Sequence, residues 1–165
     1  MIVVSNTSPL SNLVAIGELD LLCMLYDRVY VPQAVLNELA AGVRVRPEHA
    51  QVERAQWIVP MAVRDDALVR VLRVELHPGE AEAIALALEL GADLVLLDEK
   101  AGRRLARTRG LNIVGLVGSV LEAKMKSLVP SVRPILDALR SIAGFYLGDA
   151  LYALALDLAD ETDEH

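Results

Sequence analysis

The stretch GEAEAIALALELGADLVLLDEKAGRRLA, at residues 79–106, predicts a helix, a strand and a second helix in immediate succession. Residues 80–90 are almost entirely apolar and are followed by Gly91, a residue type that commonly ends helices. Residues 94–97 form a short apolar run, and residues 101–109 predict an arginine-rich helix that ends at Gly110. Because the strand is apolar on both faces and lies between helices, this stretch predicts a parallel sheet covered by helices on both sides.

The same alternation of strand and helix continues on both sides of this stretch. Short runs of β-branched or apolar residues predict strands at residues 2–4, 28–31 and 112–115, and an edge strand at residues 57–61. Helices are predicted at residues 8–17, 18–26, 33–41, 47–55, 66–76, 117–126, 132–142 and 149–160. The predicted fold class is therefore α/β, a three-layer α/β/α sandwich with a central parallel sheet.

Length and composition indicate one globular domain. The chain has 165 residues, of which 54% are hydrophobic and 24% are charged, and this composition excludes disordered and collagen-like classes. We expect a single domain over residues 1–156, followed by an acidic C-terminal tail at residues 157–165. The acids of that tail are Asp157, Asp160, Glu161, Asp163 and Glu164. The net charge of -7 argues against broad, nonspecific adhesion to nucleic acid.

The sequence also indicates the cellular compartment of the protein. The longest apolar runs, residues 83–88 and 150–156, fall short of the roughly 20 residues that a membrane-spanning helix needs. The N-terminus lacks the basic segment of a secretory signal. The single cysteine, Cys23, permits no internal disulfide. We therefore expect a cytoplasmic protein without membrane contact.

Acidic residues occur where α/β sheets carry their functional sites, just beyond the carboxyl ends of strands. Asp98 directly follows an apolar strand, and Glu80 and Glu82 lie in the first turn of the apolar helix. Glu38 lies on the predicted helix at residues 33–41. Each has a structural alternative: Asp98 as a helix N-cap, Glu80 as a partner of the helix dipole, and Glu38 as a surface acid. If the acids converge, their repulsion calls for a hard cation, which predicts a metal-dependent phosphodiesterase.

Four stretches together resemble a known family across nearly the whole chain. They are VVSNTSPLSNL at residues 3–13, VYVPQAVLNEL at 29–39, the opening stretch at 79–106, and LNIVGLVGSVLEAK at 111–124. On these motifs the chain resembles the PIN domain family, in particular the VapC-like toxin ribonucleases and their uncharacterised relatives. The resemblance implies an α/β/α sandwich, hydrolysis of RNA phosphodiester bonds with Mg²⁺ or Mn²⁺, and inhibition by a cognate antitoxin.

The resemblance also implies site residues. Its metal-ligand positions fall on Asn6, Glu38, Glu80 and Asp98, with Glu82 and Asp93 as auxiliary ligands. The three carboxylates at the main positions, Glu38, Glu80 and Asp98, are the implied catalytic residues. In this mechanism the acids hold one or two metal ions, and an activated water attacks the phosphorus in line.

Asn6 departs from the family pattern, which has an aspartate at this position. An amide oxygen still binds a hard cation, but it brings no negative charge. Reduced metal affinity is therefore expected, with activity that is weak, biased toward manganese, or lost.

Four further residues are predicted to contact RNA: Ser8, Arg103, Arg104 and Arg107. Ser8 has the alternative role of a helix N-cap before Pro9, and the arginines have the alternative role of a solvated surface stripe.

Two other functions compete with the toxin ribonuclease. One is a catalytically weak or inactive PIN-like module that binds RNA or a protein, which Asn6 favours. The other is a receiver-like domain phosphorylated on Asp98, which is disfavoured because no paired acids follow the first strand. The leucines within residues 10–26 indicate either core packing or a groove for an antitoxin or a homodimer partner.

Overall fold

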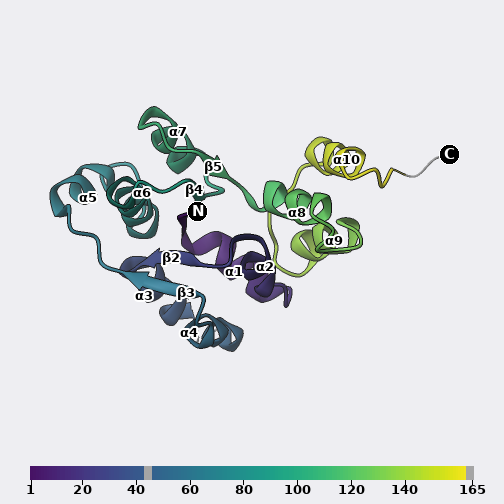
Figure 1. The fold of residues 1–165 in the computed structure, drawn as a ribbon, viewed down its shortest axis with the longest axis horizontal. Helices are drawn as coiled ribbons and strands as arrows, with labels where there is room; N and C mark the ends of the chain where they lie inside the picture. The colour runs from purple at the N-terminus through teal and green to yellow at the C-terminus, as the bar shows by residue number, and fades with distance from the viewer. Residues whose placement is uncertain (43–45, 163–165) are drawn as a thin grey trace.

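Five parallel strands form one sheet in the computed structural model, which describes residues 1–42 and 46–162. The strands are β1 (Val3–Ser5), β2 (Val29–Pro32), β3 (Ile58–Met61), β4 (Leu94–Leu96) and β5 (Ile113–Val114). Their order is β3-β2-β1-β4-β5 (Figure 1), so the first strand lies at the centre. The register pairs Val4 with Tyr30 on one side and with Val95 on the other. The predicted parallel sheet is confirmed.

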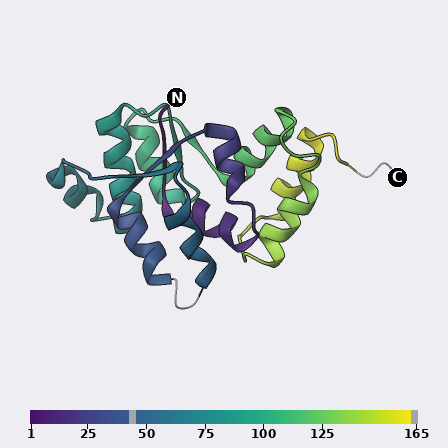
Figure 2. The ribbon, with the colours of Figure 1, turned by 60° about the horizontal axis from the view of Figure 1, so that its bottom comes forward.

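Helices connect the strands. They are α1 (Thr7–Ala15), α2 (Asp20–Tyr26), α3 (Gln33–Gly42), the 3₁₀ helix η1 (Pro47–His49), α4 (Ala50–Arg54), α5 (Asp66–Leu72), α6 (Pro78–Leu90), α7 (Lys100–Thr108), α8 (Leu116–Met125), α9 (Arg133–Ser141) and α10 (Asp149–Leu158). Figure 2 shows α8, α9 and α10 packed together at one end of the molecule. Among the described helices, none has both the length and the apolar content that crossing a membrane requires.

The two faces of the sheet bury different sets of helices. Val3 and Leu96 belong to a core that includes residues of α1 to α4 and α8 to α10. Val4 and Val95, their neighbours along the strands, belong to a second core with α5, α6 and α7. Successive side chains of a strand point to opposite faces, so the strands are apolar on both sides because both sides are covered. The predicted three-layer α/β/α sandwich is confirmed.

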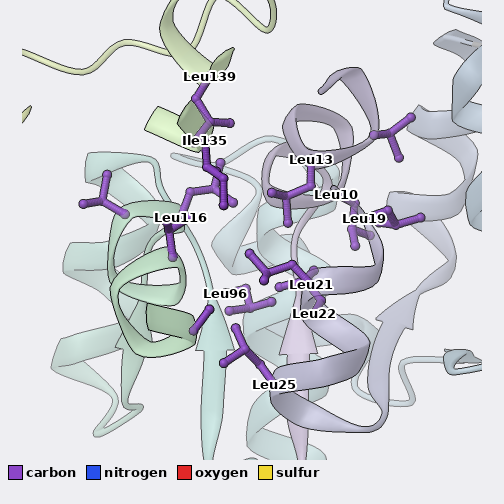
Figure 3. Close-up of a cluster of buried hydrophobic side chains, with 14 of the residues drawn as sticks. Leu10, Leu13, Leu19, Leu21, Leu22, Leu25, Leu96, Leu116, Ile135 and Leu139 are labelled. Atoms are coloured by element: carbon purple, nitrogen blue, oxygen red, sulfur yellow. The ribbon is translucent and has the colours of Figure 1, made fainter. Parts of the chain in front are cut away.

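The leucines of α1 and α2 lie in the first of these cores. Leu13 and Leu22 are fully buried, and Figure 3 shows them in one cluster with Leu116 of α8 and Leu139 of α9. Each fully buried leucine contributes roughly 1.5–3 kcal/mol to the free energy of unfolding. These side chains therefore hold the C-terminal helices against the sheet, and the surface from which a groove or homodimer face was predicted is core.

Two N-cap residues differ from those considered in the sequence analysis. The N-cap of α1 is Asn6, with extended backbone angles, so Ser8 lies in the first turn and the N-cap role predicted for it is wrong. Likewise, the residue that precedes α7 as N-cap is Glu99, one position after Asp98. Asp98 therefore belongs to the connection between β4 and α7.

The predicted acidic tail overlaps the last helix, because α10 extends to Leu158 and Ala159 is buried. The Glu161 carboxylate accepts hydrogen bonds from the Val132 and Arg133 amides at 2.7 and 3.2 Å. These bonds tie the residues after α10 to the start of α9. The last two acids predicted for the tail, at positions 163 and 164, lie outside the described residues.

Candidate metal site

A polar pocket of about 490 Å³ opens beyond the carboxyl ends of the central strands. It is lined by Asn6, Thr7, Ser8, Ser11, Asn12, Glu38, Arg46, His77, Pro78, Glu80, Glu99 and Ala143. The N-termini of α1, α6 and α7 all contribute residues to it. This is the position at which open α/β sheets bind their ligands.

Asn6 presents a buried oxygen to this pocket. Its backbone amide donates to the Leu96 carbonyl at 3.1 Å, which fixes it beside the end of β4. Asparagine is a preferred N-cap because its side chain usually accepts a bond from its own helix, yet Asn6 makes no such bond. The residue is only 3% exposed, and Oδ1 has no hydrogen-bond partner among the described residues. The amide oxygen is therefore available to a ligand.

Glu80 is the most strongly perturbed acid of the site. It is the third residue of α6, and its carboxyl group accepts a hydrogen bond from the backbone of the N-cap, His77. This bond turns the side chain back toward the start of the helix. Glu80 is 3% exposed, and Oε2 has no partner among the described residues. Burial, the carboxyl group of Glu99 and the charge of Glu38 raise the pKa of Glu80 to about 8.

His77 and Glu99 complete a cluster around Glu80 that sequence reasoning did not find. One ring nitrogen of His77 and one carboxylate oxygen from each acid lie within 4.8 Å of one another. His77 and Glu99 are exposed, whereas Glu80 is buried between the two helix starts. The available signal was the HPGE sequence at residues 77–80, in which proline and a glutamate two positions later mark a helix start.

Glu38 is held by two hydrogen bonds. The Gly79 amide donates to Oε1 at 2.9 Å, and the Thr7 hydroxyl donates to Oε2. These bonds join α3 to the starts of α1 and α6 across the pocket. Glu38 is therefore positioned beside Glu80 by groups on two other helices.

Asp98 lies beside this cluster and is not among the residues that line the pocket. Oδ1 accepts the Leu116 amide at 3.0 Å at the start of α8, and the buried Oδ2 has no partner among the described residues. Burial raises the pKa of Asp98, against the opposing effects of the Leu116 amide and the Arg103 guanidinium. Asp98 and Glu99 are thus adjacent in the chain, but only Glu99 joins His77 and Glu80.

Each of the three predicted catalytic acids lies against a glycine. A Cβ atom on Gly79 would stand 2.7 Å from Glu38 Oε2, one on Gly102 would stand 2.7 Å from Glu80 Oε2, and one on Gly115 would stand 2.6 Å from Asp98 Oδ1. Real Cβ atoms do not approach oxygen this closely, so the carboxylates occupy space that only glycine leaves open. These oxygens, together with the unpartnered ones, form a donor set that suits a hard divalent cation.

The two predicted auxiliary ligands are engaged elsewhere. Glu82 accepts the Ala34 amide at 3.2 Å and so caps the start of α3. Asp93 lies at the amino end of β4, where Oδ2 accepts the Ile2 amide at 2.6 Å. Neither side chain lines the pocket, because residues two apart on a helix face different ways and Asp93 is at the opposite end of its strand.

The predicted RNA contacts are also separated. Ser8 lines the pocket and accepts a hydrogen bond from Asn12 at 3.1 Å. Arg103 is half-buried beside Asp98, whereas Arg104 and Arg107 are exposed on α7 and none of the three lines the pocket. Among the described arginines, Arg46 does line it, and sequence reasoning missed Arg46 because no motif surrounds it.

Comparison with known proteins gives one result. A family model described as a PIN domain matches residues 2–161. The chain has no significant match among curated proteins and none among solved structures.

Proposed function

The chain belongs to the PIN domain family, and from that premise we propose that it is a divalent-metal-dependent ribonuclease that hydrolyses RNA phosphodiester bonds. One observation carries the proposal: Asn6 Oδ1, Glu80 Oε2 and Asp98 Oδ2 are buried at the carboxyl edge of the sheet without hydrogen-bond partners among the described residues. A buried polar group without a partner costs roughly 1–3 kcal/mol. Each of these three oxygens would gain a partner if a cation bound at this edge of the sheet.

In this proposal Mg²⁺ or Mn²⁺ is held by oxygens of Asn6, Glu38, Glu80 and Asp98. The bound cation supplies charge to stabilise the phosphate and to activate water. Thr7 and Gly79 keep the Glu38 carboxylate directed into the pocket through their hydrogen bonds. Glu80 must release the proton that its raised pKa retains near neutral pH before both of its oxygens can act as ligands.

The rest of the pocket supports an RNA substrate. Arg46 brings a cationic side chain to the pocket wall, where it can bind a phosphate that flanks the scissile bond. Ser8, Ser11 and Asn12 offer hydroxyl and amide groups for the sugar and phosphate oxygens. Arg104 and Arg107, exposed on α7, can contact further phosphates along the RNA strand.

Asn6 favours a second candidate function, a weakly active or inactive module that binds RNA or a protein. The first ligand position carries a neutral amide, so the site has one negative charge fewer than four carboxylates would supply. The variant Asn6→Asp separates the two functions, because a weakened nuclease gains metal-dependent activity from the added charge and a binding module does not.

The test is cleavage of a single-stranded RNA by the metal-stripped protein after addition of Mn²⁺ or Mg²⁺. We expect Glu80→Gln and Asp98→Asn to lower the cleavage rate at least about tenfold, because each removes a ligand charge. Glu75→Gln, which changes an exposed acid outside the pocket, is the matched control and should cleave like the wild type. Cleavage that is absent for both the wild type and Asn6→Asp would leave the binding module as the function.

We further propose that this nuclease acts in the cytoplasm as a toxin with a cognate antitoxin, as its resemblance to the VapC-like branch suggests. A homodimer belongs to the same proposal, although the leucines of α1 and α2 are buried and cannot form its interface. Induced expression tests the toxin role: growth should arrest with the wild type and continue with Glu80→Gln. Equal growth in both cultures would contradict it.

A further inference from the structure

We infer that His77 is a ligand of the metal ion in this site, and that its imidazole makes the site prefer Mn²⁺ over Mg²⁺. The inference rests on the proposed function, because it concerns the same pocket, but it assigns a role to a residue outside the acidic set. Three observations support this role of His77: the geometry around Glu80, the backbone conformation of His77, and the unpartnered oxygens of Asn6 and Glu80.

The geometry around Glu80 fits one ion. The ring nitrogen of His77 and oxygens of Glu80 and Glu99 lie within 4.8 Å of one another. Two ligand atoms with metal bonds of about 2.1 Å stand at most about 4.2 Å apart when they lie on opposite sides of an ion. His77 and Glu99 are exposed, so small rotations of these two side chains close the difference. Glu80 is buried and supplies the fixed point of the set.

The backbone holds His77 at the edge of the pocket. It is the N-cap of α6, with φ -67° and ψ 156°, and Pro78 follows it in the first helical position. The side chain does not cap the helix and makes no hydrogen bond to any described residue. Asparagine, aspartate or serine would stabilise this N-cap more than histidine does. A histidine here therefore gives up helix stability and leaves its ring free to bind a ligand.

An independent observation points to a ligand at the same place. Asn6 and Glu80 each have an oxygen without a partner among the described residues, and both residues are 3% exposed. Both residues line the same pocket as His77. The cluster is therefore more than a group of surface acids, because the pocket that His77 lines also contains the buried acceptors of Asn6 and Glu80.

The chemistry of the donors sets the preference among metals. Mg²⁺ takes oxygen ligands almost exclusively, whereas imidazole nitrogen suits transition metals. Asn6 and His77 are both neutral donors, so Glu80 and Glu99 supply the charge on this side of the pocket. A site with fewer charges and one nitrogen loses more affinity for Mg²⁺ than for Mn²⁺.

The experiment is calorimetric titration of Mn²⁺ and of Mg²⁺ into metal-stripped wild type, His77→Asn and His77→Asp. Both substitutions place a better N-cap residue at position 77, so α6 should form in each variant. We expect His77→Asn to weaken Mn²⁺ binding at least about tenfold and to change Mg²⁺ binding much less. His77→Asp restores a hard oxygen ligand, so it should shift the preference toward Mg²⁺.

Pulsed electron paramagnetic resonance of the Mn²⁺-loaded proteins supplies a direct readout. A nitrogen coupling from imidazole should be present in the wild type and in Glu75→Gln, and absent in both His77 variants. Equal Mn²⁺ to Mg²⁺ affinity ratios in the wild type and His77→Asn, without nitrogen coupling in the wild type, would overturn the role of His77. In that case Mn²⁺ binding that Glu80→Gln abolishes would still support the proposed nuclease. A wild type that binds neither ion would overturn both.

Discussion

The two ends of β4 carry acids in opposite situations. At the amino end, the Asp93 carboxylate accepts the Ile2 amide at 2.6 Å and joins β4 to the start of the chain. At the carboxyl end, Asp98 Oδ2 is buried and has no partner among the described residues. A carboxylate that stabilises the fold has its partner within the protein, whereas one that binds a ligand is left with an unsatisfied oxygen.

The same contrast occurs within one helix. Near the end of α6, Glu89 accepts the backbone amides of Arg64 and Asp65, both at 2.7 Å. Near its start, Glu80 has an oxygen without a partner in the described part of the chain. Glu80 and Glu89 are thus nine positions apart on one helix, but Glu89 holds the loop before α5, whereas we propose that Glu80 binds a cation. The hydrogen-bond partners, rather than the residue type, distinguish the two roles.

The largest expected effect of this difference is on stability as a function of pH. Glu80 has a pKa of about 8 in the folded protein and an ordinary value of 4.5, to which unfolding returns it. Between these values the unfolded state binds fewer protons than the folded state, so the free energy of unfolding falls as pH rises. We expect the metal-free protein to lose a few kcal/mol between about pH 5 and pH 8.

Thermal unfolding in the presence of a chelator, followed by circular dichroism, measures this loss. Glu80→Gln should remove most of the pH dependence, because glutamine resembles the protonated acid and does not titrate. Glu89→Gln is the matched control on the same helix and should keep the pH dependence of the wild type. If Glu80→Gln and the wild type lose the same stability as pH rises, then Glu80 does not have a raised pKa in the folded protein.

The second effect concerns the space around Glu80. In Gly102→Ala the new Cβ would lie 2.7 Å from Glu80 Oε2 and 3.2 and 3.3 Å from the methyl groups of Leu97. Because the contact with Oε2 is the shortest and lies below any real Cβ contact, the Glu80 carboxylate must move. We expect Mn²⁺ affinity to fall about tenfold, as it does when a ligand loses its orientation.

Calorimetric titration measures that affinity, with Ala101→Gly as the control. Position 101 is exposed on the same helix, so its change should cost about 1 kcal/mol of helix stability and leave Mn²⁺ binding intact. Alanine at position 102 should favour the helix by a similar amount. Unchanged Mn²⁺ affinity in Gly102→Ala would mean that Mn²⁺ binding does not depend on the present position of the Glu80 carboxylate.

The fold could be predicted from the sequence because its signals are local. Apolar runs such as residues 94–97 read as buried strands, and Gly91 does end α6 in a left-handed conformation with φ +59°. The carboxyl edge of the sheet could be predicted as well, since parallel strands bring their ends together. Asn6, Glu38 and Glu80 accordingly line one pocket.

The finer arrangement of the site could not be predicted because it depends on single backbone torsions. Asp98 and Glu99 are consecutive acids after the same strand, and nothing in their spacing indicates that Glu99 faces Glu80 while Asp98 faces α8. His77 was missed for a related reason: a histidine before proline carries no motif, and its nearness to Glu99 arises only when α6 and α7 start side by side. Glu82, predicted as an auxiliary ligand two residues after Glu80, instead accepts the Ala34 amide at the start of α3.

The smallest expected effect is at the amino end of β4. Asp93→Asn keeps an oxygen that can accept the Ile2 amide, but it removes the charge that strengthens the bond. We expect the free energy of unfolding to fall by about 1 kcal/mol, measured by urea unfolding, because the bond is exposed to solvent. Mn²⁺ affinity should equal that of the wild type, since Asp93 does not line the pocket.

Asp98→Asn, at the other end of β4, should show the reverse. Its Mn²⁺ affinity should be lost and its free energy of unfolding kept or increased, because the substitution removes a buried carboxyl group whose pKa burial already raises. If both variants lost stability alike and bound Mn²⁺ alike, hydrogen-bond satisfaction would not separate structural from functional acids in this protein.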